Sequence, residues 1–386
     1  MKSLIKFLAL FSLVAMIGLY SCDKDDDTNG EPLTAEQAKQ EISEANDEII
    51  QNFEGMTSAS GMKTMMYLMV DLNMMEMEKL FQVTSQAMSP NNLLRFTVNP
   101  VGNKFFKPTD NKENSFFTPG IYEYDYIEEA FIKISEHPED LFTVYFPADQ
   151  TAYDAQDNNA IADLTTFETE TFTFFDEYEG YYDEQIPVAI DFNLKIDDVL
   201  VLDFSFAATW IINEYEDGVY PTSLAVSVTD DPYSMSVSWS GSGDNYTAEA
   251  SIKDNNIILA GADISVILTN QSFEDSPEKI SGYLIIAPIK ADGYINLYAA
   301  EQAAEEDPPN VDLMNENISV DLYQTELNQK LGTLEAKIFM YDDSQEIEPV
   351  IVFEDGSWEK LEVLFEDVEA YFEDFFSDIF PDEEPQ

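Results

Sequence analysis

The residues that usually carry nucleophilic and metal chemistry are almost absent from this chain. His137 is the only histidine and Cys22 the only cysteine among 386 residues. A Ser-His-Asp or Cys-His system would have to use His137, which lies beside Pro138 in a predicted surface turn. Zinc sites of the usual kind need several histidine or cysteine ligands. The composition therefore excludes those zinc sites and any disulfide within the chain.

Carboxylates, in contrast, are abundant: 77 acidic residues face 18 basic ones, and the net charge is −59. Two carboxylates can hydrolyse a glycosidic bond, so a carboxylate-dependent glycoside hydrolase or another envelope hydrolase stays open as an alternative. Acidic clusters on proteins are mostly solvated surface, and the spacing of so many acids singles out no pair. We therefore predict no catalytic residue and a non-enzymatic role.

The charge balance also limits the partners. Nucleic-acid binding depends on lysine and arginine to neutralise phosphates, and Arg95 is the only arginine. Anionic membranes and polyanionic glycans would repel such an acidic surface. We predict no nucleic-acid partner, which leaves a glycan, an apolar ligand or a basic protein as alternatives.

One segment near the N-terminus matches a calcium-loop pattern. Residues 25–36 read DDDTNGEPLTAE, which fits D-x-[DN]-x-[DN]-G-x5-E. The oxygen ligands would be Asp25, Asp27, Asn29 and Glu36. Pro32 stands where such loops normally pair through a hydrophobic residue. We expect no cofactor, and calcium in this loop is the alternative to a flexible tether.

Two stretches, residues 172–182 and 210–220, mix aromatic and acidic residues near predicted turns. Tyrosine and tryptophan rings offer stacking area, and neighbouring carboxylates can bind sugar hydroxyls or a basic partner. Trp210 also continues the apolar alternation of a predicted strand, so the alternative is that these rings lie in the core. The candidate ligand-binding residues are Phe172, Tyr178, Tyr181, Tyr182, Trp210 and Tyr215.

The first residues have the pattern of a secretory signal. Lys2 and Lys6 precede an apolar run from Phe7 to Leu19, which is too short for a membrane-spanning helix. The run ends in Leu19-Tyr20-Ser21-Cys22. We predict cleavage before Cys22 and lipidation of its thiol, because the sole cysteine lies where a signal of this length should be cut.

This N-terminus resembles that of outer-membrane lipoproteins of the Bacteroidota. Leu19 to Cys22 looks like a lipobox, and the acidic run after it is similar to the export signal that places such lipoproteins on the outer face of the outer membrane. The export residues would be Asp23, Asp25, Asp26 and Asp27. The resemblance implies a lipid-anchored outer-membrane protein that faces the cell exterior. The layout of the whole chain also resembles a group of uncharacterised Bacteroidota lipoproteins, which implies no functional residue.

The elements that must position these residues are mostly strands. Residues 186–212 alternate apolar and polar side chains around Asp197-Asp198, which predicts a hairpin with one buried face. Thr34 and Gln37 form a capping box for a helix to about Phe53. We predict an α+β fold with N-terminal helices, a large one-sided antiparallel sheet and a C-terminal amphipathic helix over residues 361–379. The sheet would be a meander, with a curved half-barrel or a sandwich as alternatives.

The organisation of the chain follows from these patterns. We expect a non-enzymatic surface binding or scaffold module in the cell envelope, whose ligand the sequence does not identify. The expected segments are a signal peptide at 1–21, a lipidated acidic tether at 22–33, helices plus antiparallel sheet at 34–300, an acidic linker or loop at 301–317, and strands with a terminal helix, packed on the same sheet, at 318–386.

Overall fold

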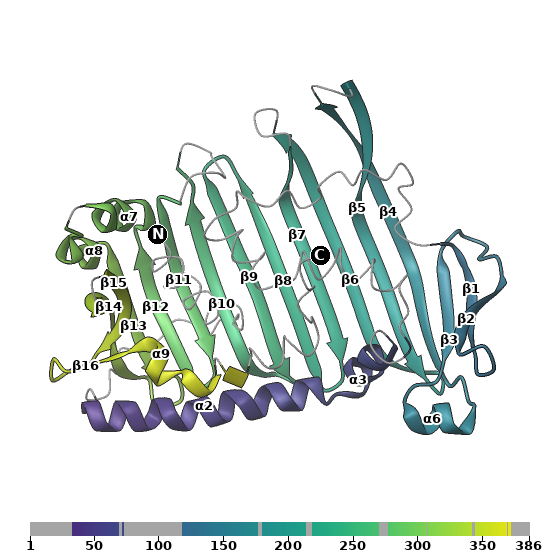
Figure 1. Ribbon diagram of the computed structural model, residues 1–386, viewed down its shortest axis with the longest axis horizontal. Helices are drawn as coiled ribbons and strands as arrows, with labels where there is room; N and C mark the ends of the chain where they lie inside the picture. The colour runs from purple at the N-terminus through teal and green to yellow at the C-terminus, as the bar shows by residue number, and fades with distance from the viewer. Residues whose placement is uncertain are drawn as a thin grey trace. The chain divides into compact units, whose positions relative to one another are not determined.

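The strands form one large, mixed and mainly antiparallel sheet. The computed structural model describes residues 33–68, 72, 118–176, 180–213, 218–269, 277–306, 308–341, 344–368 and 370–371. Within these residues 16 strands follow the order β16-β15-β14-β13-β12-β11-β10-β9-β8-β7-β6-β5-β4-β3-β1-β2 (Figure 1). All the described strands belong to this single sheet, so the two packed sheets of a sandwich are not found among them. The predicted meander is confirmed, apart from one parallel pair, β1 with β3.

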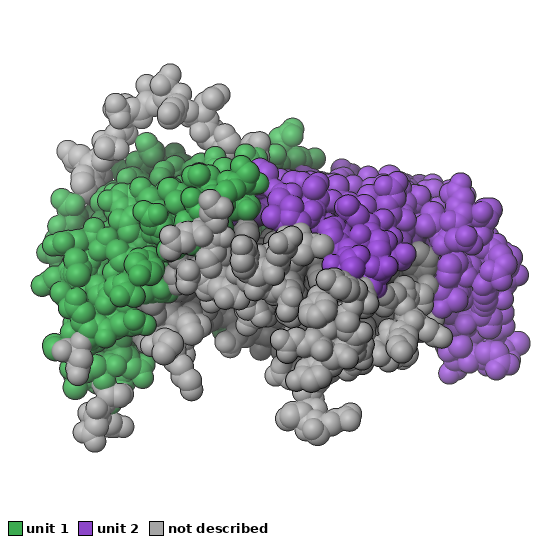
Figure 2. Space-filling view, turned by 90° about the horizontal axis from the view of Figure 1, so that it is seen from above, with its two compact units in different colours: residues 1–54, 93–102, 241–386 green, residues 55–92, 103–240 purple. Residues whose placement is uncertain are grey.

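The chain consists of two compact units (Figure 2). Unit 1 comprises residues 1–54, 93–102 and 241–386, and unit 2 comprises residues 55–92 and 103–240. The division falls inside β8 rather than in the expected linker at 301–317. That stretch instead contains most of α7 and the whole of α8, which begins where the Asn310 side chain accepts the Leu313 N–H at 3.1 Å.

Unit 2 is organised around the hairpin that the alternation of residues 186–212 predicts. The strands β5 and β6 pair antiparallel with Ile196 opposite Val199. Asp197 and Asp198 have φ values of 50° and 65°, as a two-residue type I′ turn requires. The elements of unit 2 are α3 (Ser60–Met66), β1 (Gly120–Asp125), β2 (Ala130–Ser135), β3 (Phe142–Phe146), α6 (Gln150–Ala155), β4 (Ala160–Asp176), β5 (Gly180–Ile196), β6 (Val199–Asn213), β7 (Gly218–Asp230) and β8 (Tyr233–Ser242).

Unit 1 packs helices against one face of its strands. Thr34 and Gln37 form the predicted capping box, because the Gln37 N–H donates to Thr34 Oγ1 and the Thr34 N–H donates to Gln37 Oε1. The helix that follows buries Ala38, Ile42 and Ala45 in the same core as the strands. The elements of unit 1 are α2 (Ala35–Thr57), β9 (Asn245–Asp254), β10 (Ile257–Ile267), β11 (Lys279–Ile286), β12 (Ile289–Ile295), α7 (Leu297–Glu305), α8 (Val311–Glu316), β13 (Ile318–Gln324), β14 (Gln329–Tyr341), β15 (Ser344–Val352), β16 (Trp358–Lys360) and α9 (Leu361–Leu364).

The C-terminal apolar stripe begins as predicted. Leu361, Phe365 and Val368 are buried, and Leu361 and Phe365 belong to the core of unit 1. The labelled helix α9 ends at Leu364, and the Phe365 N–H still donates to the Leu361 carbonyl at 3.1 Å. The rest of the predicted helix, from residue 372 on, lies outside the described residues.

Candidate functional site

A group of aromatic, lysine and glutamate side chains lies on the last strands of unit 1. Successive side chains of a strand alternate between faces, so Lys337, Phe339 and Tyr341 share one face of β14. Lys337 lies opposite Glu348 of β15. We call this group the aromatic–lysine cluster; it consists of Lys337, Phe339, Tyr341, Glu348, Trp358, Lys360 and Glu362.

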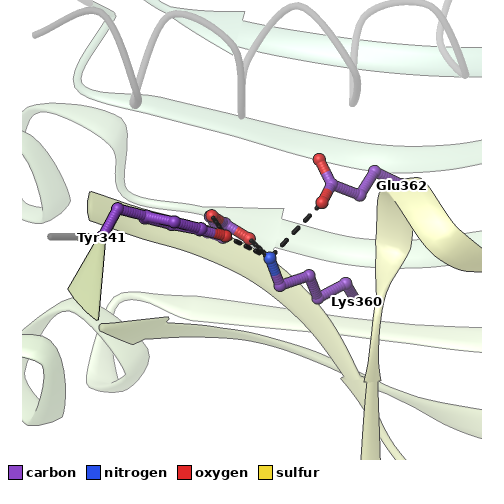
Figure 3. Close-up of polar contacts among 4 residues, drawn as sticks. Tyr341, Lys360 and Glu362 are labelled. Carbon is purple, nitrogen blue, oxygen red and sulfur yellow. Dashed lines mark hydrogen bonds and ion pairs between the residues drawn. The ribbon is translucent and has the colours of Figure 1, made fainter. Parts of the chain in front are cut away.

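Lys360 connects the polar groups of the cluster. Its Nζ lies 2.6 Å from Glu348 Oε2 and 3.4 Å from Glu362 Oε1, and it also donates to the Tyr341 hydroxyl oxygen (Figure 3). The Tyr341 hydroxyl in turn donates to Glu348 Oε1. The side chains of Lys360 and Glu348 are only 18% and 15% exposed, so water screens this pair less than a fully exposed one. The network therefore holds the Tyr341 ring in one position.

The rings of the cluster contact one another and the lysines. Lys360 Nζ lies 4.4 Å from the Phe339 ring centroid, and Lys337 Nζ lies 5.7 Å from that of Trp358. Phe339 and Trp358 meet edge to face at 5.5 Å. These distances are within the range of cation–π and aromatic pair contacts. The Tyr341 and Trp358 residues nevertheless remain 41% and 42% exposed, so both offer ring surface to a ligand.

The charges of the cluster differ from those of the whole chain. Its two lysines and two glutamates cancel formally, whereas the chain carries −59. The hydrogen bond to Glu348 raises the pKa of the Tyr341 hydroxyl, and the same glutamate raises the pKa of Lys360. Neither shift moves a pKa towards neutrality, so Tyr341 stays neutral and Lys360 stays charged at physiological pH.

The same pairing of lysine with an aromatic ring recurs on two strands nearby in unit 1. Lys279 of β11 lies 4.4 Å from the Tyr294 ring, and Lys290 of β12 lies 4.8 Å from the Tyr283 ring. Lys290 also pairs with Asp292 at 2.7 Å. Because Tyr283 and Asp292 are directly opposite in the β11–β12 ladder, these side chains share one face.

The aromatic residues singled out from the sequence occupy other positions. Phe172 and Trp210 are only 7% and 5% exposed, and Trp210 Nε1 donates to the Pro187 carbonyl at 2.9 Å. Neither offers a free ring face, as the core alternative anticipated. Tyr181 and Tyr182 lie on β5 opposite Phe175 and Phe174, but the structure does not describe their side chains. Tyr178 and Tyr215 lie outside the described residues.

The predicted lipidation and calcium residues are also mostly outside the described part. Cys22, Asp23, Asp25, Asp26, Asp27 and Asn29 fall there, and Glu36 lies exposed in the first turn of α2. The residues that the structure does describe contain no group of three or more His, Cys, Asp or Glu side chains placed to hold a metal. His137 is part of a local turn, where its Nδ1 accepts the N–H groups of Glu139 and Leu141 at 3.2 and 3.3 Å.

Sequence reasoning missed the aromatic–lysine cluster, although part of its signal is visible. Lys337, Phe339 and Tyr341 alternate along the run that ends at residue 341, and Trp358 and Lys360 have the same spacing after the turn at 354–357, where no strand is predicted. A period of two with aromatic and lysine side chains indicates a strand face that is not purely core. The contact between the two runs comes from strand pairing through β15, which neither run shows by itself.

No helix in the described ranges has the length and the apolar character needed to cross a membrane. Comparison of the chain with protein-family models, with curated proteins and with solved structures finds no match.

Proposed function

We propose that this chain is a lipid-anchored, non-enzymatic binding module of the cell envelope, and that its ligand is a neutral glycan bound at the aromatic–lysine cluster. The observation that carries the proposal is the exposure of Trp358 and Tyr341 beside a partly buried Lys360–Glu348 pair. Preorganised rings lose little conformational entropy when a ligand stacks on them.

The chemistry of the cluster suits sugar rings. Trp358 and Tyr341 supply flat apolar surface for the C–H face of a pyranose, and Glu362 supplies an acceptor for hydroxyl groups. A polyanionic glycan would be repelled by a chain with a net charge of −59. The formally balanced charge of the cluster therefore favours a neutral ligand.

The bonds that Glu348 makes within the cluster favour ligand binding over hydrolysis. Glycoside hydrolysis needs one carboxyl group that can give a proton and another that is free to attack or to activate water. Glu348 is already bonded to both Lys360 and Tyr341. A carboxylate paired in this way is poorly placed to act as an acid or a nucleophile.

The proposed address rests on the N-terminal sequence. A lipobox that ends at the sole cysteine, Cys22, followed by Asp25, Asp26 and Asp27, supports anchoring in the outer membrane with the protein facing outwards. Cells given a fatty-acid analogue should label the wild-type protein and leave Cys22→Ala unlabelled. Equal labelling of the two would show that Cys22 is not the acylated residue.

Binding can be tested by affinity electrophoresis in gels that contain a panel of neutral polysaccharides, with alginate as an anionic comparison. We expect retardation by at least one neutral polymer and none by alginate. Trp358→Ala should weaken binding at least tenfold, about 1.4 kcal/mol, because a stacking tryptophan is typically a main contributor to affinity.

A matched control is available in the same unit. Tyr298 of α7 is 46% exposed and lies outside the aromatic–lysine cluster, so Tyr298→Ala removes a similar exposed ring. This variant should bind as the wild type does. Equal binding by Trp358→Ala and the wild type, or an equal loss in Tyr298→Ala, would remove the cluster as the binding site.

A further inference from the structure

The strand β2 lies at the outer edge of the described strands of unit 2. It pairs with β1 on one side and is the last strand in the order of the described sheet (Figure 1). No described strand pairs with its other side, and among the described residues one row of its backbone N–H and C=O groups has no ladder partner. The strand spans six residues, whereas the strand at the opposite end of the order, β16, has only three.

Little on β2 protects this edge. Phe131 packs against Tyr124 with ring centroids 5.2 Å apart, which marks the face of β2 that is covered. Ile132 points to the opposite face, and Ile132 and Ile134 are 40% and 50% exposed. Natural edge strands usually carry prolines, bulges or several charges. Here β2 has one irregularity, where the register with β1 skips Ile134, and one charge, Lys133, whose Nζ lies 2.6 Å from Glu136.

The charge around β2 indicates which kind of chain fits. Exposed glutamates flank the strand on both sides: Glu128 and Glu129 precede it, and Glu136 and Glu139 follow it. A second copy of this chain would bring the same glutamates to the same edge, and its own net charge of −59 would repel the first copy. An extended partner segment with β-branched residues in its middle and basic residues at its ends would complement both the two isoleucines and the glutamates.

We propose that β2 is a docking edge for an extended basic segment of another protein, which adds to the sheet as one more strand. Backbone hydrogen bonds along β2 give the affinity, and alternate apolar side chains of the partner cover Ile132 and Ile134. The flanking glutamates pair with its lysines or arginines. This surface is independent of the aromatic–lysine cluster, which lies in the other unit.

The test uses the purified full chain and a synthetic octapeptide of alternating lysine and valine. Two further versions carry N-methyl groups on every second residue, in one register or the other. A strand that pairs through one edge tolerates only one of the two registers. Attraction by charge alone treats the two versions alike, since methylation leaves the charge unchanged. We expect one methylated version to bind as the parent peptide does and the other to lose binding.

Two substitutions by lysine separate the edge from its surroundings. Ile134→Lys should weaken binding of the octapeptide about tenfold, because it removes an apolar contact and adds a like charge on the strand. Ile127→Lys makes the same change in charge at a turn residue that is 89% exposed and lies outside the strand. We expect this control to change the affinity much less.

Hydrogen exchange of the β2 amides identifies the occupant of the edge. The outward amides should exchange quickly in the free chain and slowly with the octapeptide. Protection in the free chain at every protein concentration would mean that the chain covers its own edge. Protection that grows with protein concentration would mean that a second copy docks there. Either result, or equal loss of binding with both methylated versions, would overturn the proposal.

Discussion

At the scale of single residues, the described part of unit 2 uses carboxylates in two opposite ways. Asp230 is 5% exposed and accepts the N–H groups of Gly61 and Met62 at 3.1 and 2.6 Å. Burial nevertheless raises its pKa, because the cost of the buried charge exceeds the gain from the two hydrogen bonds. Asp125 accepts the N–H groups of Glu128 and Ile127 on the surface, and these bonds lower its pKa.

These opposite pKa shifts predict that the contributions of Asp230 and Asp125 to stability change with pH in opposite directions. The contribution of Asp230 to stability is fully present below the unfolded-state pKa and is lost as the pH rises through its raised folded-state pKa. Lowering the pH from 7 to 4 should therefore stabilise the wild type relative to Asp230→Asn. Denaturant unfolding of both proteins at each pH measures this difference, and a pH-independent difference would contradict it.

Asp125→Asn is the matched control. The contribution of Asp125 is present above the unfolded-state pKa and is lost as the pH falls through its lowered folded-state pKa. The wild type should therefore lose its advantage in stability over Asp125→Asn in acid.

A third variant, Asp230→Ala, should lower the free energy of unfolding by about 1–3 kcal/mol at neutral pH, because it leaves the buried N–H groups without an acceptor.

At the scale of elements, the β5–β6 hairpin contains a conformational cost that can be removed. Asp197 and Asp198 both have positive φ, and a type I′ turn prefers glycine at its second position. Asp198→Gly relieves this cost, but glycine also makes the unfolded chain more flexible, which lowers stability. The net result should be a rise in the free energy of unfolding of about 0.5–1 kcal/mol.

A glycine placed in a strand of the same hairpin provides the control. Asp191 pairs with Ser205 inside the same hairpin, in extended backbone. Asp191→Gly should lower the free energy of unfolding by about 0.5–1 kcal/mol, because glycine weakens a strand interior. Chemical denaturation of the two variants should give changes of opposite sign. A loss of stability in both would show that the turn is not strained.

The sequence predicts these elements better than it predicts the site. Ile190, Phe192 and Leu194 alternate and are all buried, because strand geometry imposes a period of two on any sheet with a core on one face. The same rule explains why Trp210 lies in the core. It says nothing about which strands are neighbours. The contacts of Lys360 with Tyr341 therefore could not be read from either run alone.

At the scale of the whole molecule, the charge dominates every contact with the surroundings. The chain has 77 acidic residues and only 18 basic ones. Most carboxylates therefore have no basic side chain to pair with and repel one another across solvent. Such repulsion acts over the Debye length, which grows from about 8 Å at physiological salt to about 30 Å at 0.01 M.

This repulsion predicts that salt stabilises the protein. The melting temperature should rise as sodium chloride is raised from 0.01 to about 0.15 M, because added ions screen the folded state more than the expanded chain. Calcium at equal ionic strength should add a further rise only if the segment with Asp25 and Glu36 binds it. A melting temperature that is independent of salt would show that the repulsion is already relieved within the fold.

The strand order has a consequence for how the chain reaches its folded state. From β3 to β16, neighbours in the sheet are also neighbours in the chain. Most of these pairings therefore close only a short loop, although the connection between β12 and β13 contains α7 and α8. Little chain entropy is lost at each short connection before the next strand docks. A chain delivered from its N-terminus can extend the sheet strand by strand, with each new strand pairing to the one that emerged before it. At any moment during such growth only the newest strand is unpaired, which limits the surface that could nucleate aggregation.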